Sequence, residues 1–142
     1  MQQADIFVPF AGMMVLTLIV WSFMYIKRLS YLTKNAIDAQ LVATPEMLNE
    51  LLPASVNNPS NNLKNLFELP VLFYALCLML FVTHSVDQLH LYCAHGYLLL
   101  RAAHSVIQCT FNKVMLRFIV YALSSILLWV MVVRAALPLL MP

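Results

Sequence analysis

The stretch Ile6–Ile26, IFVPFAGMMVLTLIVWSFMYI, carries no charged side chain and decides the class of fold. A helix that crosses about 30 Å of hydrocarbon needs roughly 20 apolar residues. The stretch is too long for the core of a signal peptide and has no basic segment before it, so we interpret it as a retained first helix. Three further apolar stretches follow it: Leu66–Thr83, Leu89–Ile107 and Met115–Leu137. The pattern predicts an integral membrane protein with four transmembrane helices.

The composition agrees with a lipid environment. Hydrophobic residues make up 63% of the 142 residues and charged residues only 10%, whereas a soluble domain has about 25% charged residues. A compact chain of this size cannot hide so much apolar surface from water. The net charge of +2 and the scattered basic residues argue against a nucleic-acid partner, and two glycines exclude a glycine-rich phosphate loop. The three cysteines show no CxxC pairing, so we expect neither a disulfide framework nor a metal site.

The connections between the apolar stretches predict how the helices run. Lys27–Asn65 is expected to be a long polar loop, and inside it Thr44-Pro45-Glu46 is typical of a helix start, which predicts a short surface helix over Glu46–Leu52. The other two connections are short, and short links make neighbouring helices antiparallel. The expected fold is therefore an all-α, antiparallel four-helix transmembrane bundle.

Basic residues predict the orientation in the membrane. They gather in the first and third connections, which hold Lys27, Arg28, Lys34, Lys64, Lys113 and, just beyond, Arg117. The positive-inside rule then places these connections in the cytoplasm and both termini on the non-cytoplasmic side of the cell (inner) membrane.

Pro70 lies near the start of the second apolar stretch. A helix from Pro70 to His84 would be about 22 Å long at 1.5 Å per residue, too short to span a bilayer. The helix is therefore expected to begin earlier, near Ser60 or Asn61, so that Pro70 lies inside it and bends it.

Polar side chains recur at helical spacing on three of the predicted helices. One face of the third helix would carry His90, Tyr97, Arg101, His104 and Gln108; the second would carry Asn61, Asn65 and Glu68; the fourth would carry Arg117 and Tyr121. Except for His90 and Tyr97, these positions fall in the cytoplasmic half of the predicted bundle. Polar groups in a bilayer face the bundle interior by default. Glu68 paired with Arg101 or Arg117 would only lock the helices together, but the arginines and the histidine exceed the single acid, which favours a bound anion such as a carboxylate.

The segment Asn65-Leu66-Phe67-Glu68-Leu69-Pro70 resembles the signature of the membrane-associated proteins in eicosanoid and glutathione metabolism, the MAPEG family. Arg101, His104, Lys113, Arg117 and Tyr121 keep the spacing of polar positions in its prostaglandin E synthase branch. The resemblance covers the whole four-helix pattern, so residues 1–142 are expected to form one domain. It indicates a bacterial-type member similar to the microsomal glutathione transferases and prostaglandin E synthase.

The resemblance implies a homotrimer with a glutathione site between adjacent subunits and a lipid-open groove for a lipophilic co-substrate. Lys64, Asn65, Glu68 and His104 match positions that hold the glutathione peptide, Arg117 matches the one that stabilises its thiolate, and Arg28 matches a first-helix arginine. Arg101, Gln108 and Tyr121 complete the candidate glutathione-binding set, and no metal is implied.

Three departures from the family pattern keep two functions open. Gln108 stands where the synthase branch has a ligand-binding tyrosine, Phe118 where it has a serine, and Asn61 where it has an arginine. One hypothesis is a membrane-bound glutathione-dependent transferase or peroxidase acting on lipophilic electrophiles, in which a guanidinium favours the reactive thiolate. The alternative is a non-catalytic lipid-binding or scaffold protein with the same fold.

Overall fold

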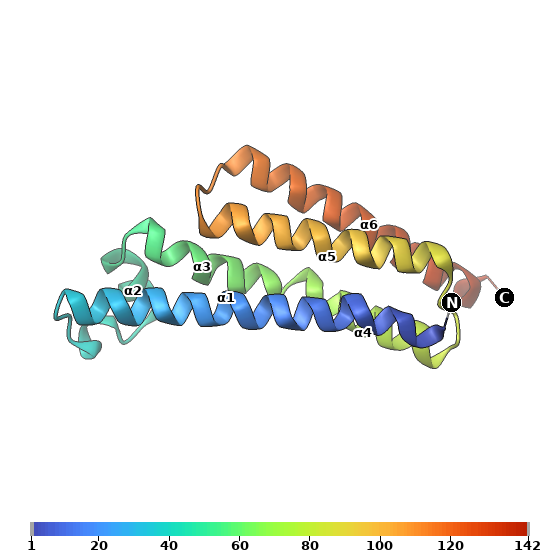
Figure 1. Ribbon diagram of the computed structural model, residues 1–142, viewed down its shortest axis with the longest axis horizontal. Helices are drawn as coiled ribbons and strands as arrows, with labels where there is room; N and C mark the ends of the chain where they lie inside the picture. The colour runs from blue at the N-terminus through green and yellow to red at the C-terminus, as the bar shows by residue number, and fades with distance from the viewer. Residues whose placement is uncertain (1, 142) are drawn as a thin grey trace.

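The computed structural model describes residues 2–141, and within that range the chain is all-helical. Its elements are η1 (Gln3–Ile6), α1 (Phe7–Lys34), η2 (Ala39–Val42), α2 (Pro45–Leu51), α3 (Ala54–Leu66), α4 (Leu69–Val82), α5 (Gln88–Cys109) and α6 (Val114–Leu140). The long helical segments run in alternating directions, so both chain termini lie at one end of the molecule (Figure 1). The prediction of an all-helical chain is confirmed.

The first helix is longer than its apolar stretch. α1 continues past Ile26 to Lys34 and ends beside Ala36, whose φ of 49° lies in the left-handed region. α3 begins at Ala54. The predicted loop over Lys27–Asn65 is therefore wrong at both ends, because hydropathy marks where a helix leaves the lipid rather than where its backbone hydrogen bonds stop.

The short helix predicted inside that connection is confirmed. α2 starts at Pro45, and the Thr44 side-chain oxygen accepts a hydrogen bond from the backbone N–H of Met47 at 3.3 Å. A threonine cap with proline at the first helical position is the combination that the sequence indicated.

Pro70 breaks a helix instead of lying inside one. A helical segment does begin well before Pro70, as expected, but α3 ends at Leu66 and α4 starts at Leu69, with Glu68 in a non-helical conformation between them. Pro70 has no N–H for the carbonyl of Leu66, and in a continuous helix its ring would clash with that carbonyl. At the start of α4 the missing N–H costs nothing.

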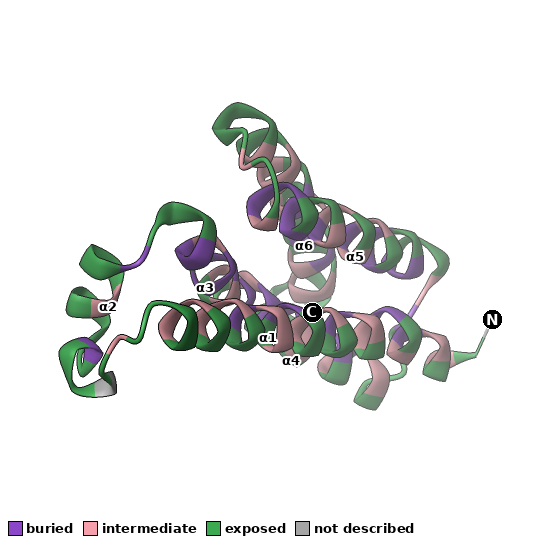
Figure 2. Ribbon diagram, turned by 60° about the vertical axis from the view of Figure 1, so that its left-hand side comes forward, coloured by how far each residue is buried: buried purple, intermediate pink, exposed green. Residues whose placement is uncertain are grey.

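Three helical segments within residues 2–141 are long and apolar enough to cross a membrane. They are Gln3–Lys34, Ala54–Val82 (α3 and α4 together) and Val114–Leu140. α5 is not among them, because the polar side chains along one of its faces lower its mean hydropathy. Large apolar side chains such as Leu18, Val82 and Leu99 are each at least 60% exposed, and exposed residues line the outer sides of the helices (Figure 2). Such a surface suits contact with lipid.

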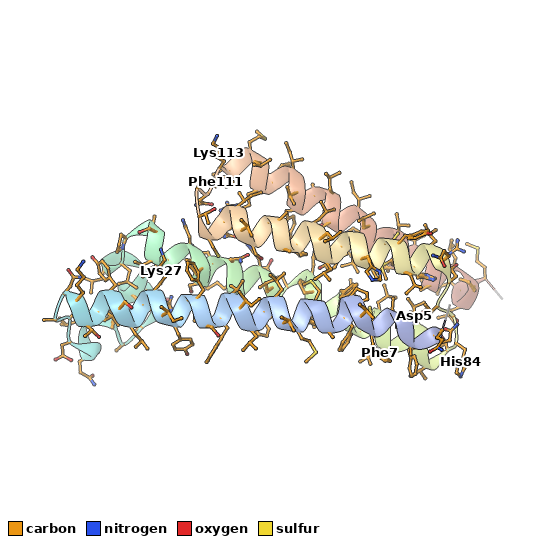
Figure 3. The ribbon with its side chains drawn as sticks, in the orientation of Figure 1. Asp5, Phe7, Lys27, His84, Phe111 and Lys113 are labelled. Atoms are coloured by element: carbon orange, nitrogen blue, oxygen red, sulfur yellow. The ribbon has the colours of Figure 1, made fainter. Side chains whose placement is uncertain are left out.

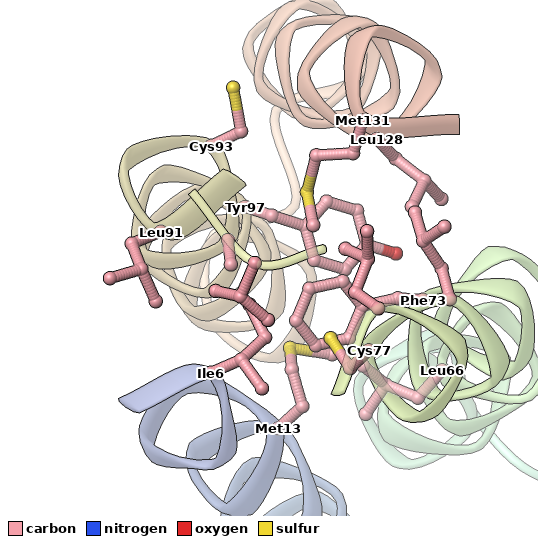
Figure 4. Close-up of a cluster of buried hydrophobic side chains, with 14 of the residues drawn as sticks. Ile6, Met13, Leu66, Phe73, Cys77, Leu91, Cys93, Tyr97, Leu128 and Met131 are labelled. Carbon is pink, nitrogen blue, oxygen red and sulfur yellow. The ribbon is translucent and has the colours of Figure 1, made fainter. Parts of the chain in front are cut away.

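The interior is apolar toward the end where the termini lie. α5 packs mainly along α6, and α1 along α3. Met13, Phe73, Cys77, Tyr97 and Leu128 are fully buried where α1, α4, α5 and α6 meet (Figure 4). The Phe73 and Tyr97 rings stack with centroids 4.7 Å apart. This packing fixes the polar face of α5 against its neighbours.

Candidate functional site

Arg101 lies at the centre of the buried polar face of α5. Its side chain is completely buried, and its Nε donates a hydrogen bond to the hydroxyl of Tyr97 at 3.2 Å. The guanidinium carbon lies 4.6 Å from the ring centre of Tyr121 on α6 and 5.4 Å from that of Tyr97. The two terminal nitrogens, Nη1 and Nη2, are buried without a hydrogen-bond partner.

The charge of Arg101 is balanced by aromatic faces rather than by an acid. Among the described residues, the ion pairs are those of Asp87 with His90 and Arg134, at the other end of α5. A cation over an aromatic ring recovers about 0.5–2 kcal/mol, whereas each unpaired buried donor costs about 1–3 kcal/mol. The arrangement therefore leaves buried donors and a positive charge that an anion would satisfy.

Tyr121 also contacts the second polar residue of the α5 face. The His104 side chain is 2% exposed, and its ring centre lies 5.6 Å from that of Tyr121. Arg101, His104 and Tyr121 thus form one cluster across α5 and α6.

One turn further along α5, Gln108 is paired with α3. The Nδ2 of Asn65 donates to Oε1 of Gln108 at 3.0 Å. The structure therefore brings together Asn65 and Gln108, two more of the candidate glutathione-binding residues.

Arg28 and Lys64 line a separate hollow between α1, α3 and the α2 segment. The hollow has a volume of about 350 Å³, and Thr44, Asn49 and Ser60 also line it. Arg28 Nη2 donates to the Ser60 hydroxyl at 2.8 Å, while its Nε is buried without a partner. Two cations beside unused N–H groups make this hollow suited to a carboxylate.

Arg117, the candidate catalytic residue, is held by a hydrogen-bond chain that the sequence reasoning missed. Its Nη1 donates to Oδ1 of Asn112 at 2.6 Å, and Nδ2 of Asn112 donates to Oδ1 of Asn58 on α3 at 3.2 Å. Asn112 has a φ of 45°, a conformation that asparagine tolerates better than most residues. In the sequence, the signal for Asn112 was an asparagine in the short connection between two predicted helices.

Glu68 and Lys64 are exposed, and Glu68 forms no ion pair among residues 2–141. The structure therefore does not contain the ion pair of Glu68 with Arg101 or Arg117 that was the alternative to an anion site. The polar face of α3 also differs from the predicted one: Asn65 faces α5 as expected, but Asn61 is exposed, whereas Asn62 is fully buried.

Asn62 joins α3 to α5. Its Oδ1 accepts from the Ser105 hydroxyl at 3.4 Å, and its Nδ2 lies 3.6 Å from Sγ of Cys109. Asn58, Asn62 and Asn65 follow the spacing of one helical face, which would have identified Asn62 from the sequence.

A metal is not indicated by the grouping of side chains. Within residues 2–141, no three His, Cys, Asp or Glu side chains come together at a spacing that would hold a metal ion. The donors that do converge are guanidinium, imidazole, amide and hydroxyl groups, which suit an organic anion.

Comparison with known proteins gives one match. Neither the curated proteins nor the solved structures contain a match to this chain. A family model described as the MAPEG family matches residues 6–137, nearly the whole chain. On that match the chain belongs to the MAPEG family.

Proposed function

We propose that this protein is a membrane-bound, glutathione-dependent transferase or peroxidase that acts on lipophilic electrophiles. The observation that carries the proposal is the Arg101 guanidinium, buried between Tyr97 and Tyr121 with two unpartnered nitrogens, in a family associated with glutathione. Glutathione carries two carboxylates and one ammonium group, and the candidate site residues include more cationic groups than acids.

The candidate site residues have two roles. Most would bind the glutathione peptide, and Arg117 would act on the glutathione sulfur. Arg28 and Lys64, which share a hollow, would bind one carboxylate. Arg101 and His104 would face the other, with Asn65, Gln108 and Tyr121 as hydrogen-bonding neighbours. Glu68, the exposed acid at the α3–α4 break, would pair with the ammonium group. None of these roles requires a metal.

Arg117 would stabilise the thiolate. A free thiol has a pKa of about 8.5 and is mostly protonated at neutral pH, and an adjacent guanidinium favours the charged form. The thiolate sulfur would then form a bond to the electrophilic carbon of a membrane-dissolved substrate as the bond from that carbon to its leaving group breaks. The proton lost by the thiol would protonate the leaving group, directly or through solvent. Asn112 would hold the Arg117 guanidinium in place through its 2.6 Å hydrogen bond.

The assembly and its placement belong to the same proposal. We infer an antiparallel four-helix transmembrane domain over residues 1–142, assembled as a homotrimer in the cell (inner) membrane with both termini non-cytoplasmic. Lys27 and Lys113 lie toward one end of the molecule, and Asp5 and His84 at the other (Figure 3), which supports this orientation through the positive-inside rule. The exposed site residues Lys64 and Glu68 would then face a neighbouring subunit.

The test is calorimetric titration of the detergent-purified protein with glutathione, alongside the ultraviolet thiolate absorbance of the complex. We expect wild type to bind glutathione and to show the thiolate band. Arg117→Ala should bind with similar affinity but lose the band, because the peptide contacts remain while the sulfur becomes protonated. Arg134→Ala, at the opposite end of the molecule, is the matched control and should behave as wild type.

The Asn112→Gly variant tests whether the hydrogen bond from Arg117 to Asn112 positions the guanidinium. Glycine accepts the φ of 45° at this position, so the turn should persist while Arg117 loses its hydrogen-bond partner. The thiolate band should weaken without disappearing, and glutathione affinity should change little. A saturated wild-type complex with no thiolate band would end the enzymatic proposal.

One observation favours the second candidate, a non-catalytic lipid-binding or scaffold protein. Arg101 is completely enclosed within the single chain, and Gln108 is already hydrogen-bonded to Asn65. If glutathione fails to bind wild type while the protein remains folded, this candidate becomes the better one.

A further inference from the structure

A second polar cavity lies at the end of the molecule where the termini meet, far from the proposed glutathione site. It has a volume of about 450 Å³, within the range of small-molecule sites. Thr83, Ser85, Asp87, His90 and Arg134 supply its polar lining. The connection between α4 and α5, the first turn of α5 and the last turns of α6 form it. These segments lie together at the end of the molecule where the termini are marked (Figure 1).

The remaining walls are apolar. Met79 and Leu80 of α4 and Ala135 and Leu137 of α6 line the cavity on that side. The cavity therefore has an apolar wall and a polar rim. The rim lies at the ends of helices that are expected to cross the membrane, so it is expected at the membrane edge. A molecule that fits it has an apolar body and a polar head.

His90 indicates what kind of head group the cavity takes. Its side chain is 4% exposed, and neither ring nitrogen has a well-formed hydrogen bond. Nδ1 lies 2.9 Å from Oδ1 of Asp87, too poorly aligned to count as a hydrogen bond. A lone pair on Nδ1 would be repelled by the carboxylate, so the hydrogen belongs on Nδ1 and Nε2 presents a lone pair. Nε2 therefore needs a hydrogen-bond donor.

The charges around His90 cancel one another. Nε of Arg134 donates to Oδ2 of Asp87 at 2.9 Å, and Nη2 of Arg134 donates to the same oxygen. Oδ1 of Asp87 also accepts from the backbone N–H of His90 at 2.8 Å. The rim thus carries one cation and one anion that are already paired, which favours an uncharged head group over a carboxylate or an amine.

We propose that this cavity binds a neutral, hydroxyl-bearing amphiphile of the membrane, such as a monoacylglycerol or a long-chain alcohol. The head-group hydroxyl donates to Nε2 of His90, and the acyl chain lies along Leu80, Ala135 and Leu137. This site is separate from the glutathione site and does not depend on the proposed catalytic function.

The experiment counts bound lipid by native mass spectrometry of the delipidated protein in detergent. The probes are a monoacylglycerol, the fatty acid with the same chain and its methyl ester. We expect the monoacylglycerol to bind at least tenfold more tightly than the methyl ester, which has no donor for Nε2, and more tightly than the fatty acid. Equal binding of all three would overturn the proposal, and tighter binding of the fatty acid would show that Arg134, not His90, selects the head group.

Two variants locate the site. His90→Phe keeps a ring of similar size but removes Nε2, and it should lower monoacylglycerol affinity about tenfold. His95→Phe, on the exposed side of the same helix, is the control and should bind as wild type. Ala135→Phe should fill the cavity from α6 and abolish binding even if His90→Phe does not fold. Unchanged binding by a folded Ala135→Phe would place the lipid elsewhere and refute the assignment.

Discussion

At the scale of single residues, Arg101 has an unfavourable position that function would explain. It is completely buried, its two terminal nitrogens lack hydrogen-bond partners, and its contacts are a hydrogen bond from Nε to Tyr97 and the faces of two tyrosine rings. Buried polar groups are normally satisfied. A ligand that pairs with these nitrogens would offset this cost, so the stability of the free protein and its affinity for the ligand should change in opposite directions when Arg101 is removed.

Arg101→Met tests this opposition. Methionine has a similar length and no charge, so removing the unpaired donors should raise the free energy of unfolding by about 1 kcal/mol, net of the lost cation–π contacts. Glutathione affinity should fall at least tenfold. Chemical denaturation in detergent and calorimetric titration measure the two effects.

The control for Arg101→Met is Arg134→Met, which removes an exposed and paired arginine. Its free energy of unfolding should fall by less than about 1 kcal/mol, with no change in glutathione affinity. A destabilised Arg101→Met would instead mean that the guanidinium has a partner, supplied by a neighbouring subunit, and would count against a free anion site.

At the scale of elements, the start of α5 depends on Asp87. Its carboxylate caps the helix by accepting from the backbone N–H of His90 and also binds Arg134 on α6. Partial burial acts to raise the pKa of Asp87, but the hydrogen bonds from His90 and Arg134 outweigh it and hold the pKa below its ordinary value. One side chain therefore ends the α4–α5 connection and ties α5 to α6.

The pH dependence of stability should reveal this lowered pKa. The unfolded carboxyl titrates near pH 4, so the stabilisation by Asp87 is fully present above that pH and is lost as the pH falls through the lower folded value. Because the pair is partly exposed, it contributes less than about 1 kcal/mol. Asp87→Asn keeps a capping side chain, so its stability should be below that of wild type at pH 7, and the difference should be smaller at pH 3. An unchanged difference between the two pH values would contradict this assignment.

Each of the two glycines lies against a leucine side chain of a neighbouring helix. A Cβ on Gly12 of α1 would lie 2.5 Å from Cδ2 of Leu98 on α5, and one on Gly96 would lie 2.8 Å from Cδ1 of Leu127 on α6. Both glycines therefore allow close approach between helices, as small residues do in membrane proteins.

Gly12→Ile should separate α1 from α5. The overpacked side chain should cost about 1–3 kcal/mol, even though glycine is a poor helix former. Ala11→Ile, on the exposed side of α1, is the matched control and should change stability by less than 0.5 kcal/mol, roughly the size of surface effects. Thermal unfolding in detergent measures both, and equal effects would show that α1 and α5 do not approach closely at Gly12.

At the scale of the whole molecule, the single chain leaves a wide apolar surface and two exposed site residues, Lys64 and Glu68. Lipid can cover the apolar surface, but exposed charged residues of a binding site require either solvent or another subunit. Together with the family assignment, this favours a site completed between subunits.

Native mass spectrometry in detergent should therefore show three copies of the chain as the main species. Arg134→Met, remote from the proposed subunit contact, should leave that distribution unchanged. A dominant monomer or dimer would remove the intersubunit site from the proposal, while leaving the contacts within the chain as they are.

The orientation in the membrane has its own test. Single cysteines placed at Gln3 and at the exposed Glu50 of α2 can be labelled with a membrane-impermeant reagent in whole cells. We expect labelling at position 3 alone, because the basic connections remain in the cytoplasm. Labelling at position 50 from outside would reverse the topology and move the candidate glutathione site to the other side of the membrane.

By itself the sequence determined the features that depend on local pattern. Apolar stretches predicted an all-helical membrane protein, Thr44-Pro45 predicted the start of α2, and the spacing of Arg101, His104 and Gln108 predicted the buried face of α5. Each of these is set by residues within a few turns of one another, because hydropathy, capping and helical periodicity act over that distance.

Tertiary structure alone decided which polar groups meet. Tyr121 covers both Arg101 and His104, and Asn112 connects Arg117 to Asn58. These contacts join residues far apart in the chain. They depend on how far each helix is rotated about its axis and where the α3–α4 break falls, and side-chain packing between helices sets those quantities.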